Sequence, residues 1–130
     1  MAKNDPIVFV VDDDPSIRKA VGRLLRSAGL AVKVFESAAE FLSHSRQSRP
    51  ECLVLDICMP EMSGVELQET LADSAPDLPI VFITAHENAR LCGWASRKDI
   101  PFLYKPFDEK SLLTAVGKAL ERSRREQRPT

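Results

Sequence analysis

Short apolar runs alternate along this chain with segments in which apolar residues recur at the period of a helix. The apolar runs occupy residues 7–11, 31–35, 52–55, 79–83 and 102–104. In the segments between and after them, apolar residues return at steps of three and four, as they do on one face of an amphipathic helix. The alternation predicts five strand and helix pairs, which favours a parallel sheet with helices on both of its faces.

Polar and small residues mark where the predicted helices begin and end. Asp14 and Pro15 suit the N-cap and first turn of a first helix, which Gly29 ends. Ser37 and Glu40 have the spacing of a capping box, so a short second helix is expected after them. The remaining helices are predicted after Gly64, over residues 87–97, and from Asp108 onwards.

The size and charge of the chain limit what it can be. Its 130 residues, of which 44% are apolar and 28% charged, suffice for one globular domain. Residues 1–121 are predicted to form this domain, and residues 122–130 a polar tail or linker stub. The net charge of -1 comes from 18 basic and 19 acidic residues, so no overall field attracts nucleic acid or an anionic membrane.

The cellular location is predicted from segments that the sequence lacks. No apolar run approaches the ~20 residues of a membrane span, and the first residues do not resemble a signal peptide. Cys52, Cys58 and Cys92 form no C-x-x-C pair and are expected to be reduced thiols rather than disulfides or zinc ligands. A cytoplasmic protein is therefore expected.

Polar side chains follow four of the five predicted strands. Asp12 and Asp13 come after the first strand, Asp56 after the third, Thr84 after the fourth and Lys105 after the fifth. In an open parallel sheet, such side chains converge at the carboxyl ends of the strands, where the strand order reverses. The distribution is consistent with strand order 2-1-3-4-5 and a switch point between strands one and three.

This convergence points to phosphoryl chemistry. Two carboxylates ~4 Å apart repel by about 4 kcal/mol at an effective dielectric of ~20, so the acidic cluster requires a counter-charge such as Mg²⁺. Asp56 can then attack phosphorus to give an aspartyl phosphate. Lys105 and Thr84 can bind the phosphoryl oxygens as an ammonium ligand and a hydroxyl donor. Asp14 is more simply explained as a helix cap than as a metal ligand.

Several short motifs make the chain resemble the response-regulator receiver family, and in particular the nitrogen-fixation regulators. The resemblance extends over about residues 6–121. It implies a doubly wound, flavodoxin- or CheY-like (βα)5 α/β fold with a five-stranded parallel sheet. The motifs are Val-Val-Asp-Asp-Asp at 10–14, Ser-Ala-Ala-Glu-Phe-Leu at 37–42, Leu-Asp-Ile-Cys-Met-Pro at 55–60, Met-Ser-Gly at 62–64, Ile-Thr-Ala at 83–85 and Lys-Pro-Phe at 105–107.

The resemblance also implies the roles of the residues in the site. Asp12, Asp13, Asp56 and the backbone carbonyl of Cys58 would hold Mg²⁺ or Mn²⁺. Asp56 would be phosphorylated by a histidine kinase or a histidine phosphotransfer protein. A cis bond between Lys105 and Pro106 would aim the lysine into the pocket. In this reading the chain is not an enzyme, apart from its own phosphorylation and dephosphorylation.

A two-state switch is implied as well. Thr84 would move towards the phosphoryl group and Phe102 would turn inward, which remodels the face of the fourth helix, fifth strand and fifth helix. That face would control a partner, an output domain or a phosphorylation-dependent homodimer. Residues 95–101 depart from the usual small-residue turn of the family and are about one residue shorter. This departure bears on dimerisation more than on phosphorylation.

Two other classes of protein use similar chemistry or a similar fold. Phosphatases of the haloacid dehalogenase type place their nucleophile after strand one in an Asp-x-Asp pattern, whereas the nucleophile expected here follows strand three. A flavodoxin-like cofactor binder would need a Ser, Thr and Gly-rich phosphate loop after strand one, which is absent. No DNA-binding module is present, so the chain is either a free-standing regulator or the receiver part of a longer one.

Overall fold

The computed structural model describes residues 7–45, 50–59, 61–84, 89–98 and 100–127. The strands are β1 (Ile7–Val11), β2 (Ala31–Phe35), β3 (Cys52–Asp56), β4 (Ile80–Thr84) and β5 (Phe102–Tyr104). The helices are α1 (Pro15–Ser27), α2 (Ala38–Ser45), α3 (Gly64–Ser74), α4 (Ala89–Arg97) and α5 (Glu109–Gln127). All five predicted strands are therefore present, and their bounds differ from the prediction by at most one residue.

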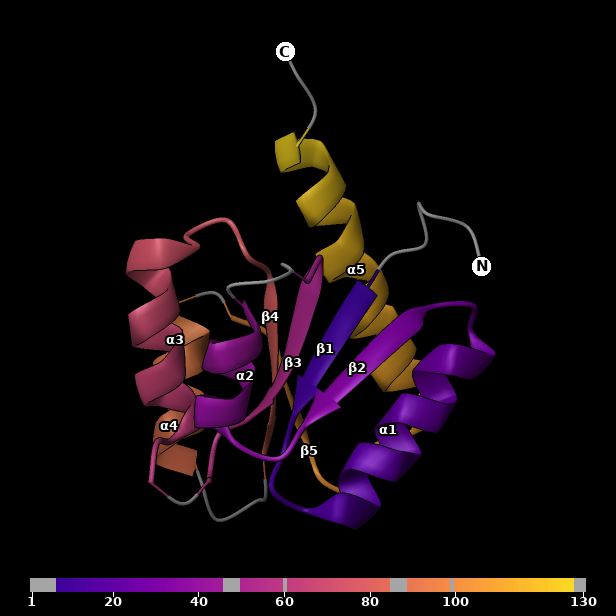
Figure 1. Cartoon of the computed structure of the whole chain (residues 1–130), viewed down its shortest axis with the longest axis horizontal. Helices are drawn as coiled ribbons and strands as arrows, with labels where there is room; N and C mark the ends of the chain where they lie inside the picture. Colours follow the sequence, from indigo (N-terminus) through magenta and orange to yellow (C-terminus); the bar gives the residue numbers. More distant parts are fainter. Residues whose placement is uncertain (1–6, 46–49, 60, 85–88, 99, 128–130) are drawn as a thin grey trace.

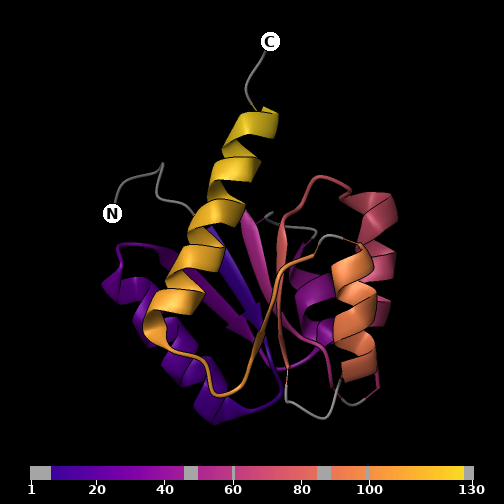
Figure 2. The same cartoon turned by 180° about the vertical axis from the view of Figure 1, so that it is seen from behind.

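The five strands form one parallel sheet in the order β2-β1-β3-β4-β5. This order confirms the predicted topology, with the reversal between β1 and β3. Figure 1 shows α2, α3 and α4 on one side of the sheet, and Figure 2 shows α5 packed beside α1 on the other. The chain is thus a three-layer, doubly wound α/β domain.

Each face of the sheet carries its own apolar core because side chains alternate along a strand. Phe9 and Val11 point into the core beneath α2, α3 and α4, together with Phe41 from α2. Val8 and Val10 point to the opposite core, which α1 and α5 cover. All the β1 residues from position 8 on are buried, and the same is true of β3 and β4. Burial on both faces explains why these strands read as continuous apolar runs.

The predicted caps of the first two helices are present, except that one capping side chain accepts its hydrogen bond from a different residue. The Asp14 carboxylate accepts a hydrogen bond from the backbone N–H of Ser16 at 2.8 Å, as expected for an N-cap. Gly29 has φ 87°, a left-handed value that suits glycine directly after a helix. The Ser37 hydroxyl accepts from the N–H of Glu40, but the Glu40 carboxylate accepts from residue 36 instead of completing the predicted capping box.

The last helix continues further than the sequence pattern indicated. Residues 122–130 were predicted as a polar tail, but α5 runs through Gln127 and buries Ser123. In Figure 2 the end of α5 extends beyond the sheet. Residues 128–130 lie outside the described part of the chain. None of the described helices is both long enough and apolar enough to cross a membrane.

Candidate phosphoacceptor site

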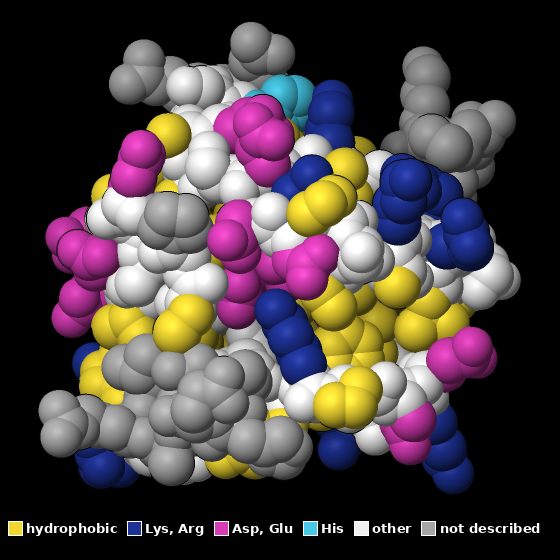
Figure 3. Space-filling view, turned by 90° about the horizontal axis from the view of Figure 1, so that it is seen from below, with side chains coloured by type: hydrophobic (Ala, Val, Ile, Leu, Met, Phe, Trp, Pro, Cys, Tyr) yellow, Lys and Arg dark blue, Asp and Glu magenta, His cyan; other side chains and the backbone are white. Residues whose placement is uncertain are grey.

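The carboxyl ends of the strands meet at one edge of the sheet. Figure 3 looks onto this edge and shows acidic side chains gathered beside a basic one. The carboxylates of Asp12, Asp13 and Asp56 offer ligand atoms that all lie within 4.8 Å of one another. Asp12 and Asp56 are buried, whereas Asp13 is exposed. The predicted acidic cluster is therefore formed, with one carboxylate at the surface and two beneath it.

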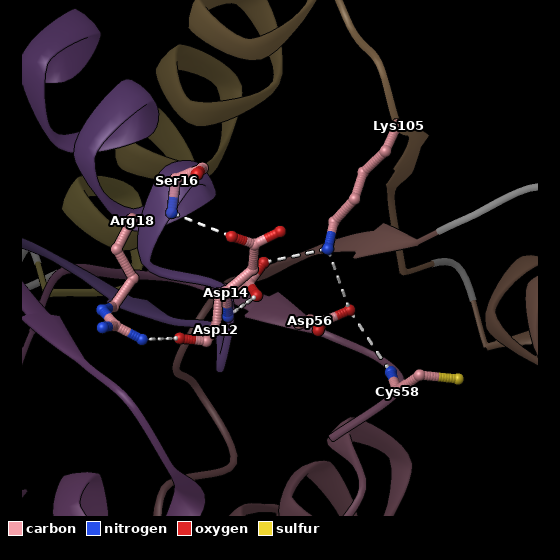
Figure 4. A network of polar contacts seen from close by, with 7 residues as sticks. All are labelled: Asp12, Asp14, Ser16, Arg18, Asp56, Cys58 and Lys105. Atoms are coloured by element: carbon pink, nitrogen blue, oxygen red, sulfur yellow. Dashed lines mark hydrogen bonds and ion pairs between the residues drawn. The ribbon is translucent and has the colours of Figure 1, made fainter. Parts of the chain in front are cut away.

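Lys105 reaches into the cluster from the end of β5. Its Nζ lies 3.1 Å from Oδ2 of Asp12 and 3.6 Å from Oδ1 of Asp56, and 22% of its side chain is exposed. Figure 4 shows the ammonium group between the two carboxylates. One cation thus contacts two buried anions that would otherwise repel each other.

The Asp56 carboxyl has a strongly shifted pKa. Burial, reinforced by the nearby Asp12 carboxylate, raises its pKa to about 7, although Lys105 and the N–H of Cys58 act in the opposite direction. Burial works to lower the pKa of Lys105, but attraction to Asp56 and Asp12 outweighs it, so that this pKa is raised. Lys105 is therefore a permanent cation, while the charge on Asp56 depends on what else occupies the site.

The donor set fits a hard divalent cation. Oδ2 of Asp12 is buried, and among the described residues its contact is the ion pair with Lys105 at 3.1 Å, with no further hydrogen-bond donor. A buried carboxylate oxygen left in this state costs free energy that a ligand can recover. Clustered carboxylates are the ligands that Mg²⁺ uses in proteins. Asp12, Asp13 and Asp56 can therefore hold Mg²⁺.

Main-chain hydrogen bonds fix the positions from which these side chains project. The N–H of Asp12 donates to the carbonyl of Phe35 at 3.1 Å, which ties the end of β1 to β2. The N–H of Lys105 donates to the carbonyl of Thr84 at 2.7 Å, which ties the main chain of the lysine to the end of β4. Because these bonds continue the hydrogen-bond pattern of the sheet, they hold the main chain at Asp12 and Lys105 in place beside the strands.

Gly64, at the start of α3, lies directly against the main chain of Asp56 and Ile57. Its N–H donates to the carbonyl of Ile57 at 2.8 Å. A Cβ at this position would collide with the carbonyl oxygen of Asp56 and would lie 2.8 Å from Cα of Ile57. The glycine in the Met-Ser-Gly motif is therefore required by the close approach of helix and strand.

The structure brings together most of the residues that the sequence singled out. Thr84 is fully buried at the end of β4, beside the strand that ends in Asp56. Phe102 lies on β5 and packs against the core, and its ring centroid lies 5.6 Å from that of Tyr104. The cis bond between Lys105 and Pro106 is present. Pro60 and Ala85, two members of the family motifs, lie outside the described residues.

Sequence reasoning missed a contact made by Arg18. Its Nη1 donates to the backbone carbonyl of Asp12 at 2.8 Å. The pattern assigned Arg18 only to the polar face of the first helix. Its position four residues after the N-cap Asp14 was a signal that it could reach back over the first turn.

Comparisons with known proteins agree with this geometry. The family model described as the response regulator receiver domain matches residues 8–117. The response regulator protein TmoT of Ectopseudomonas mendocina is 40% identical over 122 residues, which cover 93% of this chain and 56% of TmoT. The chain spans about half of the length of the curated relatives it matches, 54–56% for the first ones.

Solved structures give the same result. The crystal structure of FixJ-N is 35% identical, with a TM-score of 0.82, and the match covers 91% of this chain and 95% of that one. The structure of the response regulator StyR is 46% identical, with a TM-score of 0.82 over 95% of this chain and 63% of that one. On its sequence, its topology and its clustered strand ends, this chain belongs to the response regulator receiver domain family.

Proposed function

We propose that Asp56 accepts a phosphoryl group from a histidine kinase or a histidine phosphotransfer protein and that this modification switches the domain. Receiver domains are generally phosphorylated on an aspartate, generally bind Mg²⁺, and are generally not enzymes in the ordinary sense. The observation that carries the assignment to Asp56 is its burial at the end of β3, next to the Asp12 carboxylate and 3.6 Å from the Lys105 ammonium. The proposed activity is limited to phosphorylation and dephosphorylation of the chain itself.

The transfer is a displacement at phosphorus. A carboxylate oxygen of Asp56 forms the new bond to phosphorus, while the bond from phosphorus to the donor histidine nitrogen breaks. The imidazole leaves with the electron pair of that bond and takes up a proton. A Mg²⁺ or Mn²⁺ ion held by Asp12, Asp13, Asp56 and the carbonyl of Cys58 would neutralise charge on the phosphoryl oxygens.

Lys105 and Thr84 act after the group has arrived. The Lys105 ammonium already lies 3.6 Å from Oδ1 of Asp56, so it can pair with a phosphoryl oxygen attached there. The Thr84 hydroxyl donates a hydrogen bond to the same group, and Phe102 turns inward. The face of α4, β5 and α5 then changes shape, and it controls an output partner or a homodimer. We propose the control of this partner or homodimer, and a cytoplasmic location for the protein, together with the phosphorylation of Asp56.

Intact-mass measurement of the protein after incubation with acetyl phosphate and Mg²⁺ tests the phosphoacceptor. The expected result is the mass of one added phosphoryl group, and no addition when a chelator is present. Asp56→Asn should take up none, whereas Asp73→Asn, on the exposed side of α3, should behave as the wild type. Equal labelling of Asp56→Asn and wild type would refute the assignment.

A further inference from the structure

We propose that Arg18 is a positioning residue for the phosphoacceptor site, because it fixes the main chain of Asp12 so that the Asp12 carboxylate faces Lys105 and Asp56. This inference rests on the proposed function, since it gives Arg18 a role in that same site. Arg18 itself would not touch the phosphoryl group or the metal ion.

The contact that carries the inference is a hydrogen bond to a buried carbonyl. Nη1 of Arg18 donates to the backbone oxygen of Asp12 at 2.8 Å, and Asp12 has 0% of its surface exposed. A buried carbonyl needs a partner, and a charged guanidinium makes a stronger bond than a neutral donor. Arg18 is half-buried, so its long side chain is partly held in place by packing.

The other polar atoms of Asp12 are also fixed, with one exception. Its N–H donates to the carbonyl of Phe35 at 3.1 Å, and its Oδ1 accepts from the N–H of Asp14 at 2.9 Å. Within the described part of the chain, Oδ2 has no main-chain donor and faces Lys105 at 3.1 Å. Arg18 therefore completes a set of bonds that leaves one carboxylate oxygen of Asp12 directed at the site.

Arg18 is itself anchored to the turn that it holds. Its N–H donates to the carbonyl of Asp14 at 3.0 Å, and the Asp14 side chain caps the N–H of Ser16 at 2.8 Å. Figure 4 shows Arg18 reaching Asp12 from α1 on one side while Lys105 approaches from the other. The first turn of α1 and the acidic turn before it thus form one hydrogen-bonded unit, which sets the direction of the Asp12 carboxylate.

Substitution of Arg18 by methionine removes both the hydrogen-bond donor and the positive charge while the apolar stem remains. Lys19→Met is the matched control, since Lys19 is an exposed cation on the same helix. We expect calorimetric titration to show Mg²⁺ binding weakened by about 10- to 100-fold in Arg18→Met, the usual effect of losing a partner that orients a metal ligand. Lys19→Met should bind Mg²⁺ as the wild type does.

Arg18→Lys provides a rescue that a purely structural role would not show. An ammonium can donate one hydrogen bond to the same carbonyl, so its Mg²⁺ affinity should lie between those of Arg18→Met and the wild type. Urea unfolding of each variant establishes that it is folded before titration. If Arg18→Met does not fold, Arg18→Lys decides alone, and a wild-type affinity there overturns the inference.

The outcomes separate this inference from the proposed function. An Arg18→Met protein that is less stable to urea but binds Mg²⁺ with wild-type affinity would mean that Arg18 is only structural. A wild type that binds Mg²⁺ but takes no phosphoryl group from acetyl phosphate contradicts the proposed function, and the Mg²⁺ titrations of the variants still decide the role of Arg18. A wild type that does not bind Mg²⁺ overturns both.

Discussion

The surroundings of Asp56 disfavour the ionised form of its carboxyl group. Its pKa is raised from 3.8 to about 7, first by burial and then by the Asp12 carboxylate. The folded protein therefore binds more protons than the unfolded chain between about pH 4 and pH 7. The contribution of Asp56 to the free energy of unfolding falls as the pH rises through this window.

Asp56→Asn should remove this loss of stability. With a chelator present, we expect the variant to gain stability relative to wild type as the pH rises from 4 to 7, and to be more stable above pH 7 by on the order of 1–3 kcal/mol. Lys105 keeps its Asp12 partner in the variant, so no cation is left unpaired. Urea unfolding of both proteins at several pH values measures the difference. A difference that does not change with pH would contradict the shifted pKa.

At the level of single elements, the start of α3 is constrained by its distance from β3. The Ser63 hydroxyl and the Glu66 carboxylate form a complete capping box, and Gly64 follows the cap where the helix approaches the main chain of Asp56. Because this contact joins main chain to main chain, it can relax only if the helix moves.

Gly64→Ala should therefore destabilise the domain by about 1–3 kcal/mol or more, because the methyl group forces α3 away from the end of β3. Gly117→Ala on α5 is the matched control, since a Cβ there would have no atom of the described residues within 4 Å. The control should gain about 0.5–1 kcal/mol from higher helix propensity. Urea midpoints with unchanged slopes give both values. A Gly64→Ala protein as stable as Gly117→Ala would show that the close approach is not required.

The sequence predicted these elements well where local chemistry sets their bounds. The apolar runs of β1, β3 and β4 are buried on both faces, and Asp14 and Gly29 mark the ends of α1 by capping and by backbone conformation. The end of α5 was not predicted, because its last turns are polar and no glycine or proline interrupts them before residue 128. A polar helix end and a polar tail look alike in a hydrophobicity pattern.

The candidate site was predictable in its members but not in its contacts. Strand order alone brings Asp12, Asp56 and Lys105 to one edge of the sheet. The hydrogen bond from Arg18 to the Asp12 carbonyl depends on side-chain rotamers and on how the first turn of α1 folds back. The spacing of Arg18 from Asp14 indicates only that its side chain can reach back over the first turn, and it does not identify the Asp12 carbonyl as the acceptor.

For the whole molecule, the sheet edge should couple metal binding to global stability. Asp12 directly follows the central strand β1 and Asp56 ends the central strand β3, so unfolding the domain destroys the cluster. A cation that binds only the folded state raises its stability by mass action.

Mg²⁺ should accordingly raise the free energy of unfolding of the wild type, by ~2.7 kcal/mol at a concentration 100 times its dissociation constant. Asp13→Asn, which removes an exposed member of the cluster, should lose most of this gain while the metal-free stability changes little. Thermal or urea unfolding with and without Mg²⁺ provides the comparison. Equal stabilisation of both proteins would place the cation elsewhere.

We propose that the Asp56 side chain accepts the phosphoryl group, and the most direct measurement is to identify the residue that is modified. The wild type is incubated with acetyl phosphate and Mg²⁺ and then treated with borohydride, which reduces an acyl phosphate to an alcohol. Peptide mass spectrometry should find homoserine at position 56. Homoserine at another aspartate, or an unreduced phosphoryl group on a serine or threonine, would contradict the account.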